Sequence, residues 1–155
     1  MDERDAAAAG CDASALAGRV AQAMFARDRA AQGQGIRVLR VGPGTAEVAM
    51  RVRPDMVNAA GLCHGGFVFL VADCAFAYAS NSYNRATVAA GCAIDFLAPA
   101  REGDVLAARA NVHDGDGRTG VCDIEVTNQR GERVALARGR SHRVRGVVIG
   151  EAPDA

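Results

Sequence analysis

Lysine is absent from the 155-residue sequence, and all eighteen of its basic residues are arginine. Eighteen acidic residues balance them, so the formal net charge is zero, and no block of like charges occurs along the chain. Nucleic-acid-binding domains usually carry a basic patch, so we expect no nucleic-acid partner. We interpret the lack of lysine as the coding bias of a GC-rich genome rather than as a requirement of function.

Paired cysteines and histidine clusters are also missing. The five cysteines are odd in number, scattered and never spaced as CxxC, and they stand at positions 11, 63, 74, 92 and 122. Such cysteines usually behave as small buried apolar residues in a reducing compartment. The three histidines, at 64, 113 and 142, form no local zinc or iron cluster. These residues therefore predict no local metal cluster.

Targeting and membrane-spanning segments have no counterpart in the sequence. The start, MDERDAAAAG, lacks the basic and apolar regions of a signal peptide. The apolar run over 67–79 is too short to cross a bilayer and contains Asp73. We expect a cytoplasmic protein without a membrane partner. Its length suits one domain, over residues 12–150, after a disordered tail over 1–11.

Hydrophobic periodicity predicts one helix followed by strands. Leu16, Val20 and Met24 recur at helical spacing within 12–31, and GQG at 33–35 ends that helix. GPG at 42–44 and NQRGE at 128–132 are typical of turns. Period-two alternation predicts six strands, beginning near Ile36 and over 45–52, 87–97, 104–113, 119–128 and 132–145.

A second helix is predicted over 66–82, and it is apolar on every side. A helix of this kind belongs inside a protein, because it has no polar face to turn towards water. Six alternating strands, in turn, need a cover for their apolar face. The sequence therefore predicts an α+β fold in which an antiparallel sheet wraps around one long central helix, with an N-terminal helix before it.

Two motifs in one loop are misleading. GDGRTG at 115–120 matches the dinucleotide-binding pattern, but a strand-like segment follows it where a helix is required. Asp114, Asp116 and Glu125 have calcium-loop spacing, yet Arg118 and Thr119 occupy positions that need an oxygen ligand and a glycine. We interpret this segment as a glycine-rich hairpin turn.

Asp73 stands in the middle of the apolar helix. A carboxylate there costs free energy unless it is hydrogen-bonded, paired or protonated. Perturbed carboxylates gather at active sites, but some have only a structural partner on a neighbouring strand. Taken alone, Asp73 is compatible with either role.

The triplet HGG, which is His64, Gly65 and Gly66, stands where the irregular stretch becomes this helix. N–H groups in the first turn of a helix have no partner inside it, and with the helix dipole they suit an acyl oxygen that gains negative charge. A structural interpretation is also open, in which His64 caps the helix and the glycines allow tight packing. An oxyanion donor with a buried acid would suit acyl transfer.

The sequence resembles the hotdog-fold thioesterases, and among them most closely those of bacterial phenylacetic acid degradation. Four blocks carry the resemblance, in order and with matching spacing. They are N-x-x-G-x-C-HGG-x-x-F-x-L-x-AD-x-AFAYA-x-NS (58–82), IDFL-x-P (94–99), TGV-x-DIEV-x-NQ (119–129) and VAL-x-RG-x-SHR (134–143). The resemblance covers roughly residues 12–152.

The resemblance implies a homotetrameric enzyme, a dimer of dimers, that hydrolyses phenylacetyl-CoA and its ring-hydroxylated forms without a cofactor. It places the catalytic acid at Asp73, as general base or nucleophile, and the oxyanion N–H at Gly65. Asn58 and His64 correspond to supporting polar residues. Residues implied to contact the acyl-CoA are Gly66 and the SHR block, Ser141, His142 and Arg143.

Two other functions remain open on the sequence. A hotdog dehydratase or hydratase needs a paired histidine and carboxylate, and the nine-residue separation of His64 and Asp73 argues against such a pair within one subunit. A non-catalytic acyl-CoA-binding module is the second. Gly65 and Asp73 would lie about 12 Å apart on one helix, so we expect an active site shared between subunits. A later helix start would shorten that distance and remove this argument.

Overall fold

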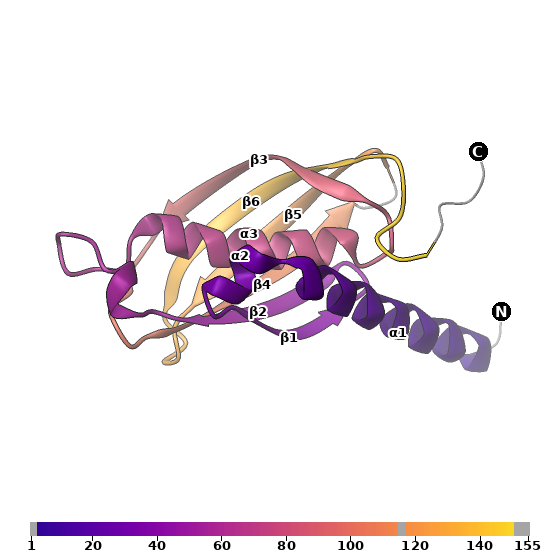
Figure 1. The fold of residues 1–155 in the computed structure, drawn as a ribbon. Helices are drawn as coiled ribbons and strands as arrows, with labels where there is room; N and C mark the ends of the chain where they lie inside the picture. The colour runs from indigo at the N-terminus through magenta and orange to yellow at the C-terminus, as the bar shows by residue number, and fades with distance from the viewer. Residues whose placement is uncertain (1–2, 115–116, 151–155) are drawn as a thin grey trace.

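The structure is a computed structural model that describes residues 3–114 and 117–150. Its helices are α1 (Glu3–Arg27), α2 (Arg29–Gly33) and α3 (Gly65–Asn81), with a 3-10 turn at Pro54–Met56. Its strands are β1 (Arg37–Gly42), β2 (Thr45–Arg51), β3 (Thr87–Phe96), β4 (Val105–Asp114), β5 (Thr119–Thr127) and β6 (Arg133–Arg143). Figure 1 shows α3 lying along the hollow of the curved sheet.

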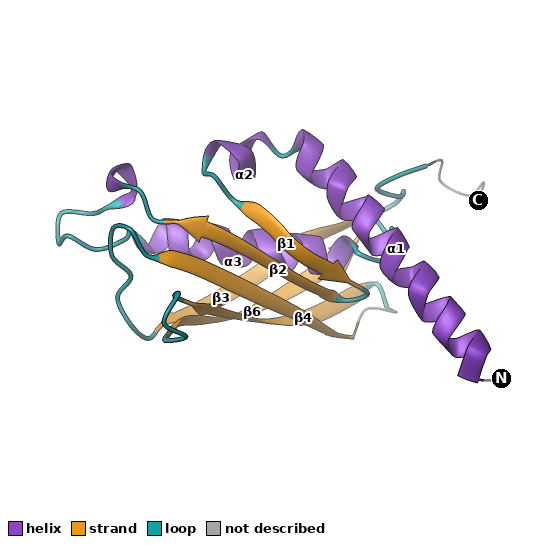
Figure 2. Ribbon diagram, turned by 90° about the horizontal axis from the view of Figure 1, so that it is seen from below, coloured by secondary structure: helices purple, strands orange, loops and turns teal. Residues whose placement is uncertain are grey.

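The strands form one antiparallel sheet in the order β1-β2-β4-β5-β6-β3. This confirms the antiparallel sheet around a central helix that the alternating pattern predicted. The edges of the sheet are β1, beside α1 (Figure 2), and β3. The strand β3 follows α3 directly, so the end of the helix and an open edge of the sheet lie close together in the chain.

The N-terminal region differs from its prediction. Residues 3–11 belong to α1 rather than to a disordered tail. They include a run of alanines, and alanine has the highest helix propensity of the amino acids. Residues 1–2 lie outside the described residues. The helix also ends early, at Arg27, because Asp28 caps the separate helix α2 by accepting a hydrogen bond from the Ala31 N–H at 2.9 Å.

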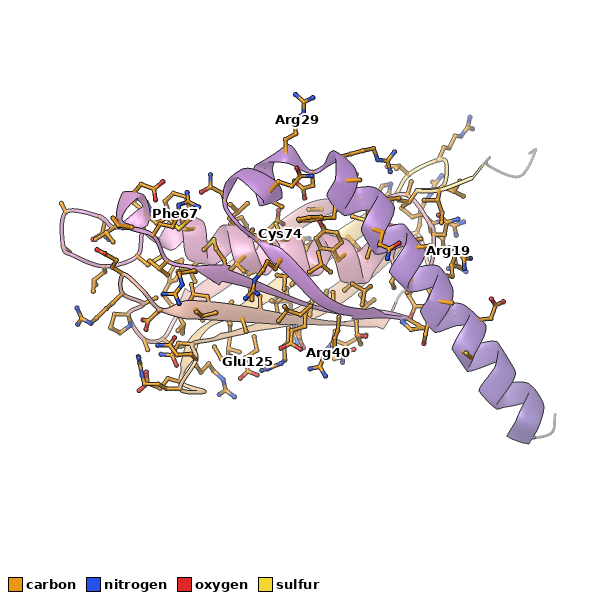
Figure 3. The ribbon with its side chains drawn as sticks, turned by 60° about the horizontal axis from the view of Figure 1, so that its bottom comes forward. Arg19, Arg29, Arg40, Phe67, Cys74 and Glu125 are labelled. Carbon is orange, nitrogen blue, oxygen red and sulfur yellow. The ribbon has the colours of Figure 1, made fainter. Side chains whose placement is uncertain are left out.

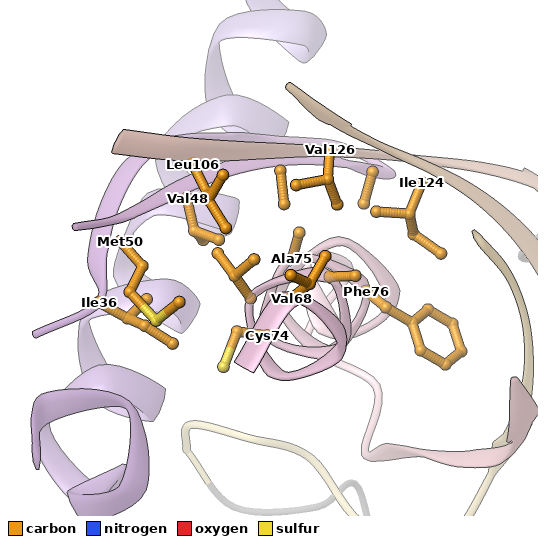
Figure 4. Close-up of a cluster of buried hydrophobic side chains, with 14 of the residues drawn as sticks. Ile36, Val48, Met50, Val68, Cys74, Ala75, Phe76, Leu106, Ile124 and Val126 are labelled. Atoms are coloured by element: carbon orange, nitrogen blue, oxygen red, sulfur yellow. The ribbon is translucent and has the colours of Figure 1, made fainter. Parts of the chain in front are cut away.

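The core lies between α3 and the concave face of the sheet, as Figure 4 shows. Strand residues such as Leu106, Ile124 and Val126 point towards Val68 and Ala75 of the helix. Alternate residues of β5 and β6 are buried, which is the period-two pattern expected when one face of a strand packs on the core.

A glycine on β6 determines how closely α3 approaches the sheet. A Cβ built on Gly139 would lie 2.8 Å from the ring of Phe76, which is closer than real side chains pack. The Phe76 ring therefore occupies the volume that any other residue at 139 would need. This contact places the helix directly on β6.

The outer face of the sheet is charged. Glu47 lies between Arg40 and Arg109, and these ion pairs lower the pKa of its carboxyl. Asp123 pairs with Arg138, which holds the Asp123 pKa at about 2. Figure 3 shows Arg40 on this side of the molecule, away from α3. Among the described residues, no helix is long and apolar enough to cross a membrane.

The misleading loop leads into a strand, as predicted. Thr119 begins β5, so no helix follows the glycine-rich motif and the geometry of a dinucleotide site is absent from the described part of this loop. Residues 115–116 lie outside the described residues, and Asp116 of the calcium-like spacing lies there with them.

Candidate active site

His64 caps the N-terminus of α3. Its backbone is extended, and its Nδ1 accepts a hydrogen bond from the Gly66 N–H at 3.2 Å. Its carbonyl accepts another from the Phe67 N–H at 2.9 Å. The Gly65 N–H makes no hydrogen bond within the described residues. It is therefore the donor of this first turn that stays open to a ligand, while the Gly66 N–H is already engaged.

The start of the helix is anchored to the strands around it. The Cys63 N–H donates to the Ala100 carbonyl and the His64 N–H to the Met56 carbonyl, each at 2.8 Å. Ala100 follows β3 and Met56 follows β2, so these two bonds fix the helix N-terminus between two segments of the sheet. The Gly65 N–H consequently has a defined position before any ligand arrives.

Asn58 organises the loop that leads to this point. Its Oδ1 accepts from the Ala60 N–H at 2.9 Å and from the Leu62 N–H at 3.2 Å. Its own backbone N–H donates to the Leu62 carbonyl. The side-chain NH₂ has no acceptor within the described residues. Asn58 thus shapes the loop with its oxygen and leaves a donor available near the helix N-terminus.

Asp73 is a half-buried carboxylate without a partner among the described residues. It makes no hydrogen bond or ion pair there, and burial alone raises the pKa of its carboxyl above the usual range. Its charge also contributes to the raised pKa of Cys92, which places it near β3. A structural partner on a neighbouring strand, one of the two roles open from the sequence, is not found in the chain as described.

Neighbouring thiols do not compete for the role of nucleophile. Cys74 follows Asp73 on the helix, and burial raises the pKa of its thiol to about 12. Burial also raises the pKa of Cys92 on β3. Because only a thiolate attacks readily, both cysteines are inert at neutral pH. Of the three groups, Asp73 is the one that sequence analysis singled out as a candidate base or nucleophile, and the two thiols do not replace it.

One side of α3 is not covered by the sheet. Five partly or fully exposed positions follow this side at a spacing of three or four residues, at Gly66, Phe69, Asp73, Ala77 and Ser80, and Gly65, Phe67 and Leu70 near the helix start are also partly exposed. Beside them, the edge strand β3 and the residue after it expose large apolar side chains, Val88, Phe96 and Leu97. Small residues on the helix and apolar residues on the edge would suit contact with a second apolar surface.

Gly65 and Asp73 lie on the same continuous helix. The helix begins at Gly65, so the alternative of a later start with a folded-back loop is wrong. Eight residues at about 1.5 Å each separate the two groups by about 12 Å along the axis. An oxyanion donor and a base must each lie about 3 Å from one thioester carbonyl. One subunit therefore cannot place both groups on the same substrate.

The SHR block lies at the other end of α3. Ser141 and Arg143 line a small cavity of about 20 Å³ together with Ser80 and Arg118. Ser141 is buried and pairs with Gly120 of β5, whereas His142 points to the opposite face of β6 and does not line the cavity. About 22 Å of helix separates Gly65 from Ser80. The structure thus separates these residues from the helix N-terminus.

Phe96 is not among the site residues predicted from the sequence, where it appears only within the block IDFL-x-P. A Cβ built on Gly65 would lie 3.0 Å from the Phe96 Cζ, so the ring rests against the glycine. The signal available in the sequence was the glycine itself, at a helix start where a neighbour approaches closely. The partner of such a glycine is visible only in three dimensions.

Comparison with known proteins places this geometry in a family. The family model described as "Thioesterase superfamily" matches residues 60–135, a range that includes Gly65 and Asp73. The acyl-coenzyme A thioesterase PaaI of Escherichia coli K12 is 48% identical over 132 residues, covering 85% of this chain and 94% of that protein. The chain belongs to the thioesterase superfamily.

Solved structures of similar proteins have the same fold. The E. coli PaaI protein of the phenylacetic acid degradation operon superimposes with a TM-score of 0.85 at 46% identity, over 86% of this chain and 97% of that one. A Streptococcus mutans UA159 protein solved with acetyl-CoA has a TM-score of 0.69 at 26% identity, over 72% and 90%. The resemblance to hotdog-fold thioesterases that the four blocks indicated is confirmed.

Proposed function

We propose that this chain hydrolyses acyl-CoA thioesters and that phenylacetyl-CoA, with its ring-hydroxylated forms, is the substrate class. The observation that carries the proposal is a pair of unsatisfied groups on α3, the Gly65 N–H and the half-buried Asp73 carboxylate. Similarity to the E. coli acyl-coenzyme A thioesterase supports the reaction. The solved structure of that protein is described as coming from the phenylacetic acid degradation operon, which supports an aromatic acyl group in the substrate.

The chemistry follows from the two groups. The Gly65 N–H donates to the thioester oxygen as the carbonyl carbon becomes tetrahedral and the oxygen gains charge. The Asp73 carboxylate takes a proton from a water molecule, whose oxygen bonds to that carbon. The C–S bond then breaks, and the CoA thiolate leaves and is protonated. His64 holds the first turn in place by capping it, so its role is positioning.

The site is proposed to form between two subunits. A two-fold axis across the uncovered side of α3 would place Gly65 of one subunit opposite Asp73 of the other, giving two equivalent sites. Gly66, Ala77 and Ser80 on that side are small and permit close helix packing, and the edge of β3 can extend its sheet into a partner. Two such dimers make the homotetramer expected from the sequence.

The CoA portion is assigned to the far end of α3. Arg118 and Arg143 line the cavity there with Ser141, and guanidinium groups suit phosphate oxygens. In an antiparallel helix pair this end lies beside the partner's helix N-terminus. His142 points to the other face of β6, so we leave it outside this contact. The cytoplasm is the proposed compartment, since the five cysteines are free.

The test is turnover of phenylacetyl-CoA, followed through the free thiol that CoA release produces. Asp73→Asn keeps the shape of the side chain and removes the base, so kcat should fall by about 100-fold or more. Folding should survive, because a neutral amide is easier to bury than a carboxylate. Near-normal turnover by the purified variant would show that Asp73 does not carry the reaction.

The same assay separates the other two functions. A hydratase would consume an enoyl-CoA without releasing thiol, and a binding module would bind phenylacetyl-CoA without turnover. His64, which a hydratase would need beside the acid, is engaged in capping nine residues away along the chain. Thiol release by the wild type at enzyme concentrations far below that of the substrate identifies a thioesterase.

A further inference from the structure

We infer that Phe96 is a specificity-determining residue whose ring contacts the acyl group of the substrate and favours an aromatic one. The inference rests on the proposed function and extends it to a residue outside the predicted site. Phe96 is the last residue of β3, and its side chain is 54% exposed although it is large and apolar. Unlike Val88 and Leu97, which are exposed on the same edge, Phe96 also packs against Gly65, the residue of the proposed oxyanion donor.

The position of the ring relative to the donor is well defined. Three ring atoms of Phe96 lie 3.0, 3.4 and 3.5 Å from the place where a Cβ of Gly65 would stand. The ring is therefore in contact with Gly65, the residue whose backbone N–H is the open donor of the first turn. We therefore infer that a carbonyl group accepting that hydrogen bond is held at the residue against which the ring packs.

The ring is held in this position by the sheet. Phe96 pairs with Ala135 of β6, and the next residue, Leu97, donates its N–H to the Val134 carbonyl at 2.8 Å. In the segment that follows, the Ala100 carbonyl accepts a hydrogen bond from the N–H of Cys63, which stands just before the helix. Strand and helix are thus joined on both sides of the contact, so the ring is a fixed wall rather than a mobile lid.

An acyl group is the part of the substrate that suits this wall. The pantetheine arm of CoA carries amides and needs hydrogen-bond partners, which a phenyl ring does not provide. An aryl group on the acyl side can meet the ring edge-to-face or offset, the arrangements that aromatic pairs prefer. Phe96 would also shield one side of the donor from water, which strengthens the hydrogen bond to the oxyanion.

The test compares phenylacetyl-CoA with cyclohexylacetyl-CoA, which has nearly the same size and apolarity but no π-system. Phe96→Leu should lower kcat/KM for phenylacetyl-CoA about fivefold, the scale of one aromatic contact, and change it less than twofold for cyclohexylacetyl-CoA. Leu39→Ala is the matched control, since Leu39 is an exposed apolar residue of the opposite edge strand. It should leave the ratio of the two rates unchanged.

A double-mutant comparison tests the contact itself. Gly65→Ala adds the Cβ that meets the ring, so its cost in kcat/KM should be several-fold smaller in a Phe96→Ala background, where that space is free. Equal costs in both backgrounds, or equal losses for both substrates in Phe96→Leu, overturn the inference. A wild type that hydrolyses no acyl-CoA refutes the proposed function instead, and this inference falls with it.

Discussion

At the scale of single residues, the two groups proposed to do the chemistry are both left without a hydrogen-bond partner among the described residues. Other polar groups around them are occupied, including the Gly66 N–H by His64 and the oxygen of Asn58 by its own loop. Asp73 and the Gly65 N–H have no such partner among the described residues. Folded proteins rarely leave buried polar groups unpaired, so each of these two has a cost that a ligand can offset.

The cost at Asp73 should be visible in stability as a function of pH. Burial raises the folded-state pKa above the unfolded value of about 3.9, so the folded state retains its proton over a range where the unfolded state has lost it. Stability contributed by this group is therefore present below about pH 4 and is lost as the pH rises through the folded pKa.

Asp73→Asn should consequently be more stable than the wild type at pH 7, by about 1 kcal/mol, and equal to it below about pH 4. Urea unfolding at matched protein concentrations measures both differences. Asp95→Asn, at an exposed carboxylate of β3, is the control and should show no such pH-dependent gain. A variant that is less stable than the wild type at pH 7 would show that the carboxylate has a stabilising partner.

The fate of one oxygen atom distinguishes the two roles left open for Asp73. If the carboxylate activates water, a single turnover in heavy-oxygen water places the label in the released acid. If Asp73 attacks the thioester, the anhydride can be opened at the aspartyl carbon, and the first product then carries an unlabelled enzyme oxygen. We expect labelled product, measured by mass spectrometry with enzyme in excess. An unlabelled first product would establish the covalent route.

At the scale of elements, the position of α3 depends on contacts at both of its ends and at its middle. Backbone bonds anchor its N-terminus, and the buried Asn81 bonds both the N–H and the carbonyl of Thr87 at its C-terminus. Between them, the Phe76 ring lies on Gly139 of β6. A shift at any of these contacts would move the Gly65 N–H and the Asp73 carboxylate, the two groups proposed to react, because neither makes a hydrogen bond of its own among the described residues.

Gly139→Ala tests how strongly the helix depends on that glycine. The added Cβ would lie 2.8 Å from the Phe76 ring, so we expect a loss of about 1–3 kcal/mol in the free energy of unfolding. Gly18→Ala is the control, because no atom lies within 4 Å of a Cβ there, and it should stabilise α1 by about 0.5–1 kcal/mol. If Gly139→Ala and the wild type had equal free energies of unfolding in urea, the helix would be able to move away from the added Cβ without cost.

Prediction from sequence was most accurate where periodicity is simple. Each of the six predicted strands corresponds to a strand of the structure, since alternating residues show directly which face is buried. The break after Arg27 was missed because Asp28 caps a second helix and also accepts a bond from the Tyr78 hydroxyl, a contact distant in sequence. Phe96 was missed for the same reason, since β3 and the helix start meet only through the sheet.

At the scale of the whole molecule, the proposed site requires two subunits. Because α3 begins at Gly65 and is continuous through Asp73, the distance of about 12 Å between these two residues follows from helix geometry alone. The oxyanion donor, the loop of Asn58 and the ring of Phe96 lie at one end of this arrangement. In the proposed dimer the acid comes from the partner, so variants of the two ends should complement each other.

Subunit complementation measures this directly. Asp73→Ala and Asn58→Ala proteins, each expected to be nearly inactive, are refolded together in equal amounts. Half of the dimers should be mixed and each should contain one intact site of two, so activity should return towards about a quarter of the wild-type value. Two distinguishable tags verify that mixed dimers form. Activity that stays at the level of the single variants in verified mixed dimers contradicts a shared site.

The uncovered side of α3 has a further consequence, for mass action. If the acid and the donor of one site come from different subunits, an isolated subunit is folded around its own core yet has no complete site. Specific activity then depends on the total protein concentration, falls on dilution below the dissociation constant of the dimer, and recovers when substrate binding draws subunits together. The cellular abundance of the enzyme, and not only its catalytic constants, would then determine how steeply thioester hydrolysis responds to its expression.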